Sequence, residues 1–156
     1  MIELSIPSYG DIKLEHLVLD LNGTIAGAGE ILEGVAEGIT TLAGVLTPIL
    51  VTADTRGTAA AIGERLGITV RVIPGTWEAG EKLELVQELG ADRVVAIGNG
   101  SNDALMFKSA GVGICVIGPE GASKVALEAA DIVVTDIRHA FALLAEPTRL
   151  LATLRS

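Results

Sequence analysis

Short apolar runs, each long enough for one buried strand, alternate along the chain with segments of helical length. The predicted strands cover residues 2–6, 16–20, 48–51, 69–73, 93–97, 111–117 and 132–134. The predicted helices cover residues 31–46, 54 or 55 to 66, 78–89, 104–109, 119–130 and 138–155. Strands that alternate with helices favour a parallel sheet with both faces covered. We therefore expect an α/β fold, a three-layer αβα sandwich with a Rossmann-like parallel sheet.

The ends of these elements are marked by residues that cap or break regular structure. Gly44 and Gly67 are predicted to end the first two helices, and Pro147 is predicted to interrupt the last one. Asp54 or Thr55 can cap the second helix. Strand 2–6 alternates apolar and polar residues, so we expect a half-exposed strand that pairs at the margin of the sheet.

Composition limits the classes of protein to which this chain can belong. Its 156 residues, 49% of them apolar, are enough for one domain over residues 1–156. The longest apolar runs are shorter than the roughly 20 residues that span a bilayer, and the N-terminus lacks the basic region of a secretion signal. We expect a cytoplasmic protein without membrane insertion. A net charge of −9 and only 3% aromatic residues argue against nucleic acid as a partner. The single cysteine, Cys115, is expected in the core.

One predicted strand ends abruptly at a carboxylate. The apolar run 17–19 is followed by Asp20, and the turn formers Asn22, Gly23 and Thr24 come next. Ligands of open α/β sheets bind outside the carboxyl ends of the strands, so the position of Asp20 indicates a site. From its position alone, Asp20 can bind a metal, act as a nucleophile or cap the turn.

Two further strands also end in polar clusters. Thr52 and Asp54 follow the strand 48–51, and the polar loop 98–103 follows the strand 93–97. Because the ends of parallel strands share one edge of the sheet, these groups are expected to converge on Asp20. Lys82, at the start of a predicted helix, can lean over the same edge.

These side chains match the needs of a phosphoryl group. A carboxylate does not bind phosphate directly, but it can hold a hard cation such as Mg²⁺ that bridges to the phosphate. Lys82, the Thr52 hydroxyl and the N–H groups of the loops supply donors for phosphate oxygens. With Asp20 nearest the centre, we expect its carboxylate to attack phosphorus and form an aspartyl phosphate that water then hydrolyses.

The order and spacing of these segments resemble the four motifs of the haloacid dehalogenase superfamily of phosphohydrolases. The matching residues are the stretch 20–24, Thr52, Lys82 and the loop 98–103, and the resemblance covers about residues 15 to 135. Within the superfamily, the segment 52–54 and the loop 98–103 look most like the phosphorylation domain of P-type ATPases. The resemblance therefore implies a soluble, Mg²⁺-dependent phosphatase related to that domain.

The resemblance also implies individual roles. Asp20 is the phosphorylated nucleophile, and its carboxylate binds Mg²⁺ together with the main-chain carbonyl of Asn22. Thr52 and Lys82 hold the phosphoryl oxygens. The remaining predicted phosphate-binding residues are Gly23, Ala53 and Asn102, and the remaining predicted metal ligands are Asn99 and Asp103.

Two positions depart from the pattern of the superfamily. Phosphatases of this type usually carry an aspartate two residues after the nucleophile as general acid and base, but Asn22 cannot exchange a proton. The second departure is Asn99, which occupies the place of a metal-binding aspartate and removes one negative charge. We therefore expect slower turnover and weaker metal binding than in a standard member.

The segments between Asp20 and Thr52, and between Thr52 and Lys82, are only long enough for the predicted helices and strands. We therefore expect no cap domain. An uncapped site is open to bulky substrates or is closed by a neighbouring subunit, and we expect a homo-oligomer.

Three functional hypotheses follow. The first is a phosphohydrolase or phosphotransferase that acts on a small phosphorylated metabolite or a phosphoprotein. The second is a non-catalytic phosphate-binding or regulatory module, suggested by Asn22 and Asn99. The third, by analogy with the P-type relatives alone, is a subunit of a transport system.

Overall fold

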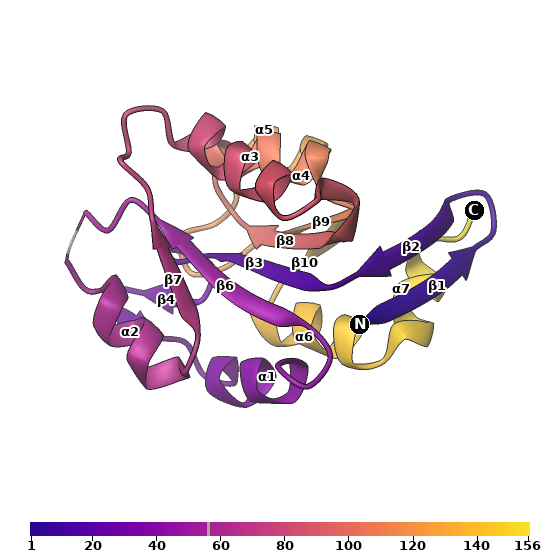
Figure 1. The fold of residues 1–156 in the computed structure, drawn as a ribbon, viewed down its shortest axis with the longest axis horizontal. Coiled ribbons are helices and arrows are strands. Elements are labelled where there is room, and N and C mark those ends of the chain that lie inside the picture. The colour runs from indigo at the N-terminus through magenta and orange to yellow at the C-terminus, as the bar shows by residue number, and fades with distance from the viewer. Residues whose placement is uncertain (56) are drawn as a thin grey trace.

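The computed structural model describes residues 1–55 and 57–156, and a parallel sheet lies at the centre of this part of the chain (Figure 1). The sheet has six strands in the spatial order β10-β9-β8-β3-β6-β7. All neighbouring pairs are parallel. The strands are β3 (His16–Asp20), β6 (Thr47–Thr52), β7 (Thr69–Val72), β8 (Val94–Gly98), β9 (Val112–Val116) and β10 (Ile132–Val134).

Helices cover both faces of this sheet, which confirms the three-layer prediction. Figure 1 shows α1 (Val35–Leu42), α2 (Ala59–Leu66) and α6 (Ile137–Ala145) on one side. On the other side lie α3 (Glu78–Glu88), α4 (Ala104–Ser109) and α5 (Lys124–Ala129). The last predicted helical segment, 138–155, is divided into α6 and α7 (Pro147–Leu154). α7 begins at Pro147, the residue that was expected to interrupt the segment.

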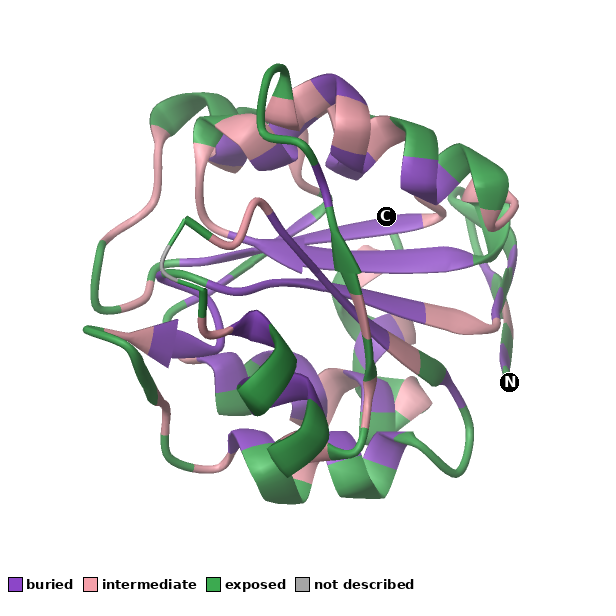
Figure 2. Cartoon of the chain, turned by 60° about the vertical axis from the view of Figure 1, so that its left-hand side comes forward, coloured by how far each residue is buried: buried purple, intermediate pink, exposed green. Residues whose placement is uncertain are grey.

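The central strands are buried along nearly their whole length, as the purple strands of Figure 2 show. In β3, Leu17 and Leu19 belong to the core under α1 and α6, whereas Val18 belongs to the core under α3 and α4. Alternate residues of a strand point to opposite faces, so one apolar run fills both cores. Cys115 in β9 is buried, as expected.

The N-terminal strand lies elsewhere than predicted. β1 (Ile2–Ile6) does not pair at the margin of the large sheet but forms a separate antiparallel pair with β2 (Gly10–Leu14). β2 runs directly into β3, so the hairpin extends the sheet at its far end, where β1 contacts α7 (Figure 1). The apolar side chains of the hairpin are buried in the core at that end. The alternating pattern of β1 is therefore satisfied without pairing in the large sheet.

Three helices are shorter than predicted. α2 begins only at Ala59, after its N-cap residue Thr58, and position 56 of the predicted helix lies outside the described residues. Residues 26–31 form a ribbon of β4 (Ala26–Gly27) and β5 (Glu30–Ile31), and α1 begins only after Gly34, whose φ is 83°. The C-cap residue of α1 is Ala43 rather than Gly44. The predicted helix 119–130 begins only at Lys124, because residues 118–121 form a turn and the Ser123 hydroxyl accepts the N–H of Ala126 as an N-cap.

The structure agrees with the expected lack of a cap domain. Among the described residues, the segment from β3 to β6 contains the β4–β5 ribbon and α1, and the segment from β6 to α3 contains α2 and β7. The carboxyl edge of the sheet is therefore not covered by an inserted domain. None of the helices in the described ranges has the length and apolar character needed to cross a membrane.

Candidate active site

A pocket of about 260 Å³ opens at the carboxyl edge of the sheet. Asp20 ends β3, Thr52 ends β6 and Asn99 follows β8, and these three strands are neighbours. Lys82 reaches the same edge from α3. The pocket is lined by Asp20, Asn22, Thr52, Ala53, Asp54, Thr55, Glu78, Lys82, Asn99, Gly100, Asn102 and Glu120. The topology thus brings together most of the predicted site residues, while Gly23 and Asp103 lie behind this lining.

Lys82 joins two carboxylates at the base of the pocket. Its Nζ atom lies 2.8 Å from Oδ1 of Asp20 and 2.7 Å from Oδ1 of Asp103. Lys82 is 1% exposed and Asp103 is fully buried. Burial disfavours the charged ammonium, but Asp20 and then Asp103 outweigh this effect and raise the pKa of Lys82 above its ordinary value. Lys82 is therefore a fixed positive charge at neutral pH.

Asp20 is the carboxylate that borders the pocket. Its Oδ1 atom accepts a hydrogen bond from Lys82, and Oδ2 accepts one from the Thr24 hydroxyl at 3.1 Å. Burial, followed by the negative charge of Asp103, raises the pKa of Asp20 to about 6. Both effects disfavour the ionised carboxylate, whereas the contacts with Lys82 and Thr24 favour it, and the resulting pKa still lies below neutral pH.

Thr24 has a larger place in the site than its position in a turn suggested. Its buried hydroxyl lies 3.1 Å from Asp20 Oδ2 and 3.1 Å from Asn99 Oδ1, so it stands between the ends of β3 and β8. The Asn99 amide donates to the main-chain carbonyl of Gly121 at 3.2 Å, which holds its oxygen toward Thr24. The sequence signal for Thr24 is its place at the end of the stretch 20–24, four residues after Asp20.

Asp103 makes contacts on both of its carboxylate oxygens. Oδ1 accepts from Lys82, and Oδ2 accepts from the main-chain N–H groups of Asn99 and Gly100, both at 3.0 Å. These contacts position Lys82 and the loop after β8. Asp103 is fully buried and is not part of the pocket lining, and its role as a cation ligand stays a prediction.

The end of β6 combines a pocket residue with a helix cap. The Thr52 hydroxyl accepts the N–H of Asp54 at 3.1 Å and is 4% exposed. Asp54 Oδ1 accepts the N–H groups of Thr58 and Ala59 at the start of α2, at 2.8 and 3.0 Å. Asp54 therefore accepts the first N–H groups of α2, but the residue at the N-cap position is Thr58 and not Asp54 or Thr55 as predicted.

Two carboxylates in the pocket lining were missed by the sequence analysis. Glu78 lies one helical turn before Lys82 and accepts a hydrogen bond from the Asn102 amide at 2.5 Å. The four-residue spacing to Lys82 places both side chains on one face of α3 and could have indicated this. Glu120 comes from the turn before α5, and no motif in the sequence pointed to it.

The donor atoms of the pocket fit a hard divalent cation. The Asp20 carboxylate, the Asn99 amide oxygen and the Asn22 carbonyl are all oxygen donors, and no main-chain hydrogen bond found between described residues ends on that carbonyl. Mg²⁺ is commonly bound by only one or two carboxylates, with waters and substrate phosphate completing its ligands. Within residues 1–55 and 57–156, no three His, Cys, Asp or Glu side chains cluster as a metal site, so the amide and carbonyl donors are needed.

Comparison with known proteins identifies the family. The model of the haloacid dehalogenase-like hydrolases matches residues 2–111. The chain belongs to this family. An uncharacterized protein of Methanocaldococcus jannaschii is 47% identical over 78 residues, which are 47% of this chain and 84% of that protein. The copper-transporting ATPase HMA5 of Oryza sativa is 44% identical over 87 residues, 54% of this chain but only 8% of the transporter.

Solved structures of the family have the same fold. The 3-deoxy-D-manno-octulosonate 8-phosphate phosphatase of Moraxella catarrhalis, solved with magnesium, phosphate and its sugar, superposes with a TM-score of 0.67 at 18% identity. The match covers 91% of this chain and 94% of that one. A zinc-transporting PIB-type ATPase in the E2.Pi state gives a TM-score of 0.65 at 27% identity, over 79% of this chain and 20% of the transporter. The hydrolase core described above is thus shared with free-standing enzymes and with P-type ATPases.

Proposed function

We propose that this protein is a Mg²⁺-dependent phosphohydrolase or phosphotransferase that forms an aspartyl phosphate on Asp20. The substrate is a small phosphorylated metabolite or a phosphoprotein. The observation that carries the proposal is the position of Asp20 at the base of a pocket that also contains Thr52 and Lys82, whose Nζ atom lies 2.8 Å from Asp20 Oδ1. The magnesium-bound sugar phosphate phosphatase with the same fold supports this reaction class.

The first chemical step uses the Asp20 carboxylate as the nucleophile and the Lys82 ammonium as a donor to the phosphoryl group. One oxygen of the Asp20 carboxylate attacks phosphorus, the bond from phosphorus to the leaving oxygen breaks, and an acyl phosphate forms. Lys82 and the Thr52 hydroxyl supply donors to the phosphoryl oxygens as negative charge develops on them. Water then attacks phosphorus, which releases inorganic phosphate and restores the carboxylate.

A divalent cation held by Asp20 and by the Asn22 and Asn99 oxygens would neutralise negative charge between the carboxylate and the phosphate. The proposed ligand set contains only one carboxylate. Metal affinity is accordingly expected to be modest.

Proton transfer is the weak point of this site. Asn22 lines the pocket where an acid would protonate the leaving group, and its amide cannot do so. We therefore expect slow hydrolysis of ordinary phosphate esters. Substrates whose leaving group is already a weak base, such as p-nitrophenyl phosphate and acetyl phosphate, should be cleaved faster.

The test is hydrolysis of p-nitrophenyl phosphate and acetyl phosphate by purified protein with Mg²⁺. Asp20→Asn is the matched control and should lower the rate by at least roughly 10³-fold. Beryllofluoride, which mimics a phosphoryl group on a carboxylate, should raise the melting temperature of the wild type only in the presence of Mg²⁺. If the wild-type protein shows no hydrolysis and no stabilisation by beryllofluoride, the proposal is refuted.

The second candidate is a phosphate-binding or regulatory module that has lost turnover. Asn22 and Asn99 favour it, because both replace carboxylates that the usual pattern of the family places in the site. Such a module would bind phosphate and beryllofluoride but hydrolyse neither test substrate. Good turnover by the wild-type protein would exclude it.

A further inference from the structure

Most carboxylates at the candidate active site already accept hydrogen bonds from other groups of the protein. Asp20 and Asp103 contact Lys82, Asp54 caps α2, and Glu78 accepts from Asn102. Glu120 lines the same pocket, yet no hydrogen bond or ion pair is found for it among the residues that the structure describes. Glu120 is solvent-exposed, and it is the one carboxylate of this lining for which neither oxygen has a partner among the described residues.

The position of Glu120 is fixed by the turn that carries it. The N–H of Gly121 donates to the carbonyl of Gly118 at 2.9 Å and closes the turn. Asn99 ties this turn to the site at two points, since its amide donates to the Gly121 carbonyl at 3.2 Å and its own carbonyl accepts from Ser123 at 3.0 Å. These two hydrogen bonds fix the position of the turn relative to the loop after β8.

The Glu120 side chain folds back over the turn that follows Asp20. A Cβ atom on Gly23 would lie 2.8 Å from Glu120 Oε2 and 2.5 Å from Asn99 Nδ2. Gly23 directly follows Asn22, whose carbonyl is one of the proposed cation ligands. The carboxylate of Glu120 accordingly lies against the backbone that carries this ligand and on the side of Gly23 that faces Asn99.

We propose that Glu120 is a ligand of the divalent cation, the second carboxylate of a site formed with Asp20, the main-chain carbonyl of Asn22 and the side-chain amide oxygen of Asn99. The inference rests on the proposed function, because it assumes a cation at Asp20. Glu120 supplies a negative charge that Asn99, as a neutral amide, does not carry. Two carboxylates with carbonyl oxygens and water are a common ligand set for Mg²⁺.

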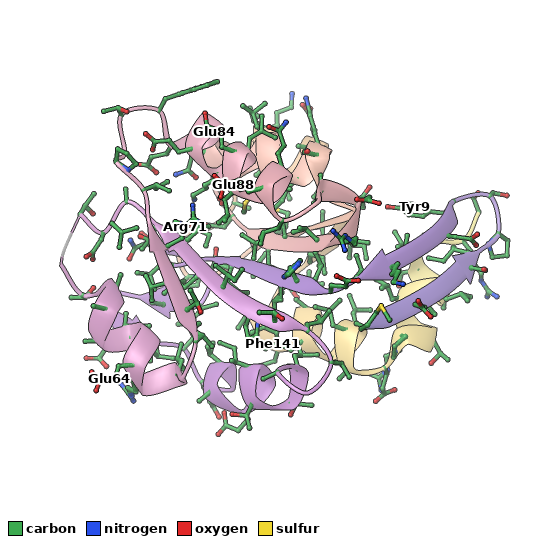
Figure 3. All side chains as sticks on the ribbon, viewed as in Figure 1. Tyr9, Glu64, Arg71, Glu84, Glu88 and Phe141 are labelled. Carbon is green, nitrogen blue, oxygen red and sulfur yellow. The ribbon has the colours of Figure 1, made fainter. Side chains whose placement is uncertain are left out.

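The test is Mn²⁺ binding without substrate, followed by electron paramagnetic resonance of the free ion. The variants are Glu120→Gln, Asp20→Asn and the surface control Glu64→Gln, which removes the same charge from α2, where Glu64 points away from the molecule (Figure 3). Glu120→Gln should weaken Mn²⁺ binding by about tenfold or more, because ligand charge sets cation affinity. Glu64→Gln should leave it unchanged, and circular dichroism should show that all variants are folded.

Two further variants separate ligation from general electrostatic attraction. Glu78→Gln removes a negative charge from another residue of the pocket lining, and it should weaken Mn²⁺ binding less than Glu120→Gln does. Asn99→Asp in the Glu120→Gln background returns one carboxylate to the site and should recover most of the lost affinity. Equal losses in Glu78→Gln and Glu120→Gln would overturn the proposal.

The outcomes for the two proposals differ. Wild-type and Glu120→Gln proteins that bind Mn²⁺ equally well would overturn the role of Glu120 while the proposed function stands. A wild-type protein that does not bind Mn²⁺ would overturn both. Binding that Asp20→Asn abolishes and Glu120→Gln weakens supports both.

Discussion

The Nζ atom of Lys82 lies 2.8 Å from Oδ1 of Asp20, although the two residues are 62 positions apart in the chain. Asp103 contacts the same ammonium group at 2.7 Å, so one buried cation balances two buried carboxylates. Charges removed from water are tolerated only when they are paired and hydrogen-bonded. The base of the candidate site is therefore also a determinant of stability.

Lys82→Met should destabilise the fold strongly, since it leaves Asp20 and Asp103 buried without their cation. Removing one partner of a buried ion pair costs about 3–5 kcal/mol in free energy of unfolding. Urea denaturation measures this change. The loss should be smaller at acidic pH, where the carboxyl groups can be protonated.

Arg71→Met is the matched control for Lys82→Met. Arg71 forms an ion pair with Glu88 at 3.1 Å, but both side chains are about half exposed and lie on the surface formed by β7 and α3 (Figure 3). An exposed pair contributes about 0–1 kcal/mol. Equal destabilisation by both substitutions would contradict the special position of Lys82.

The cation-free protein should lose stability relative to Asp20→Asn as the pH rises from about 4 to 6. The pKa of Asp20 is about 6 in the fold and 3.8 ordinarily, so in this window the folded chain binds the proton more tightly than the unfolded chain. Asparagine does not titrate and lacks this effect. Unfolding of both proteins in urea and EDTA, followed across this pH range, measures it.

Mg²⁺ should reduce this pH dependence, because a bound cation favours the ionised carboxylate and lowers its pKa. If the free energies of unfolding of the wild type and Asp20→Asn in EDTA differ by a constant amount between about pH 4 and 6, the pKa of Asp20 is not raised.

Asn22→Asp should accelerate phosphate ester hydrolysis, because it adds to the pocket lining an ionisable carboxyl group that can protonate the leaving group. General acid catalysis contributes about 10²–10⁴ in rate, and a gain of this order is expected for a substrate with a poor leaving group. Steady-state kinetics with a phosphorylated sugar alcohol and with p-nitrophenyl phosphate measure the difference between the two leaving groups.

The double variant Asp20→Asn/Asn22→Asp is the control for Asn22→Asp and should remain inactive. Hydrolysis that Asn22→Asp leaves unchanged would indicate that proton transfer does not limit the reaction, or that the site does not turn over.

Gly23→Ala should disturb both stability and metal binding. Gly23 has a φ of 80°, and an added Cβ would collide with Asn99 and Glu120. The strained backbone alone costs about 1–3 kcal/mol, and the collisions add to it. Thermal unfolding and Mn²⁺ titration measure the two effects.

Gly67→Ala isolates the cost of the backbone in Gly23→Ala. Gly67 has a φ of 66° after α2, with no heavy atom within 4 Å of an added Cβ. Gly67→Ala should cost about 1–3 kcal/mol in free energy of unfolding, the cost of the strained backbone alone, without changing Mn²⁺ affinity. A Gly23→Ala protein that matches Gly67→Ala in both measurements would contradict the close packing at Gly23.

The sequence by itself determined the fold class, the family and the edge of the sheet at which the site lies. Apolar runs that stop at Asp20, at Thr52 and before Asn99 fix which strands are central, because a parallel sheet buries both faces of such runs. Parallel strands have their carboxyl ends at one edge, so the convergence of these groups was predictable without coordinates. Order and spacing of the same segments were enough to indicate the family.

Only the tertiary structure decided which polar side chains of the site contact one another. That Asp103 contacts Lys82, and that the Glu120 carboxylate folds over Gly23, depend on side-chain directions and on a turn whose place no local pattern specifies. The pairing of β1 with β2 depended likewise on where α7 offers an apolar surface. Periodicity encodes which face of an element is buried, whereas contacts between elements follow from how those faces pack together.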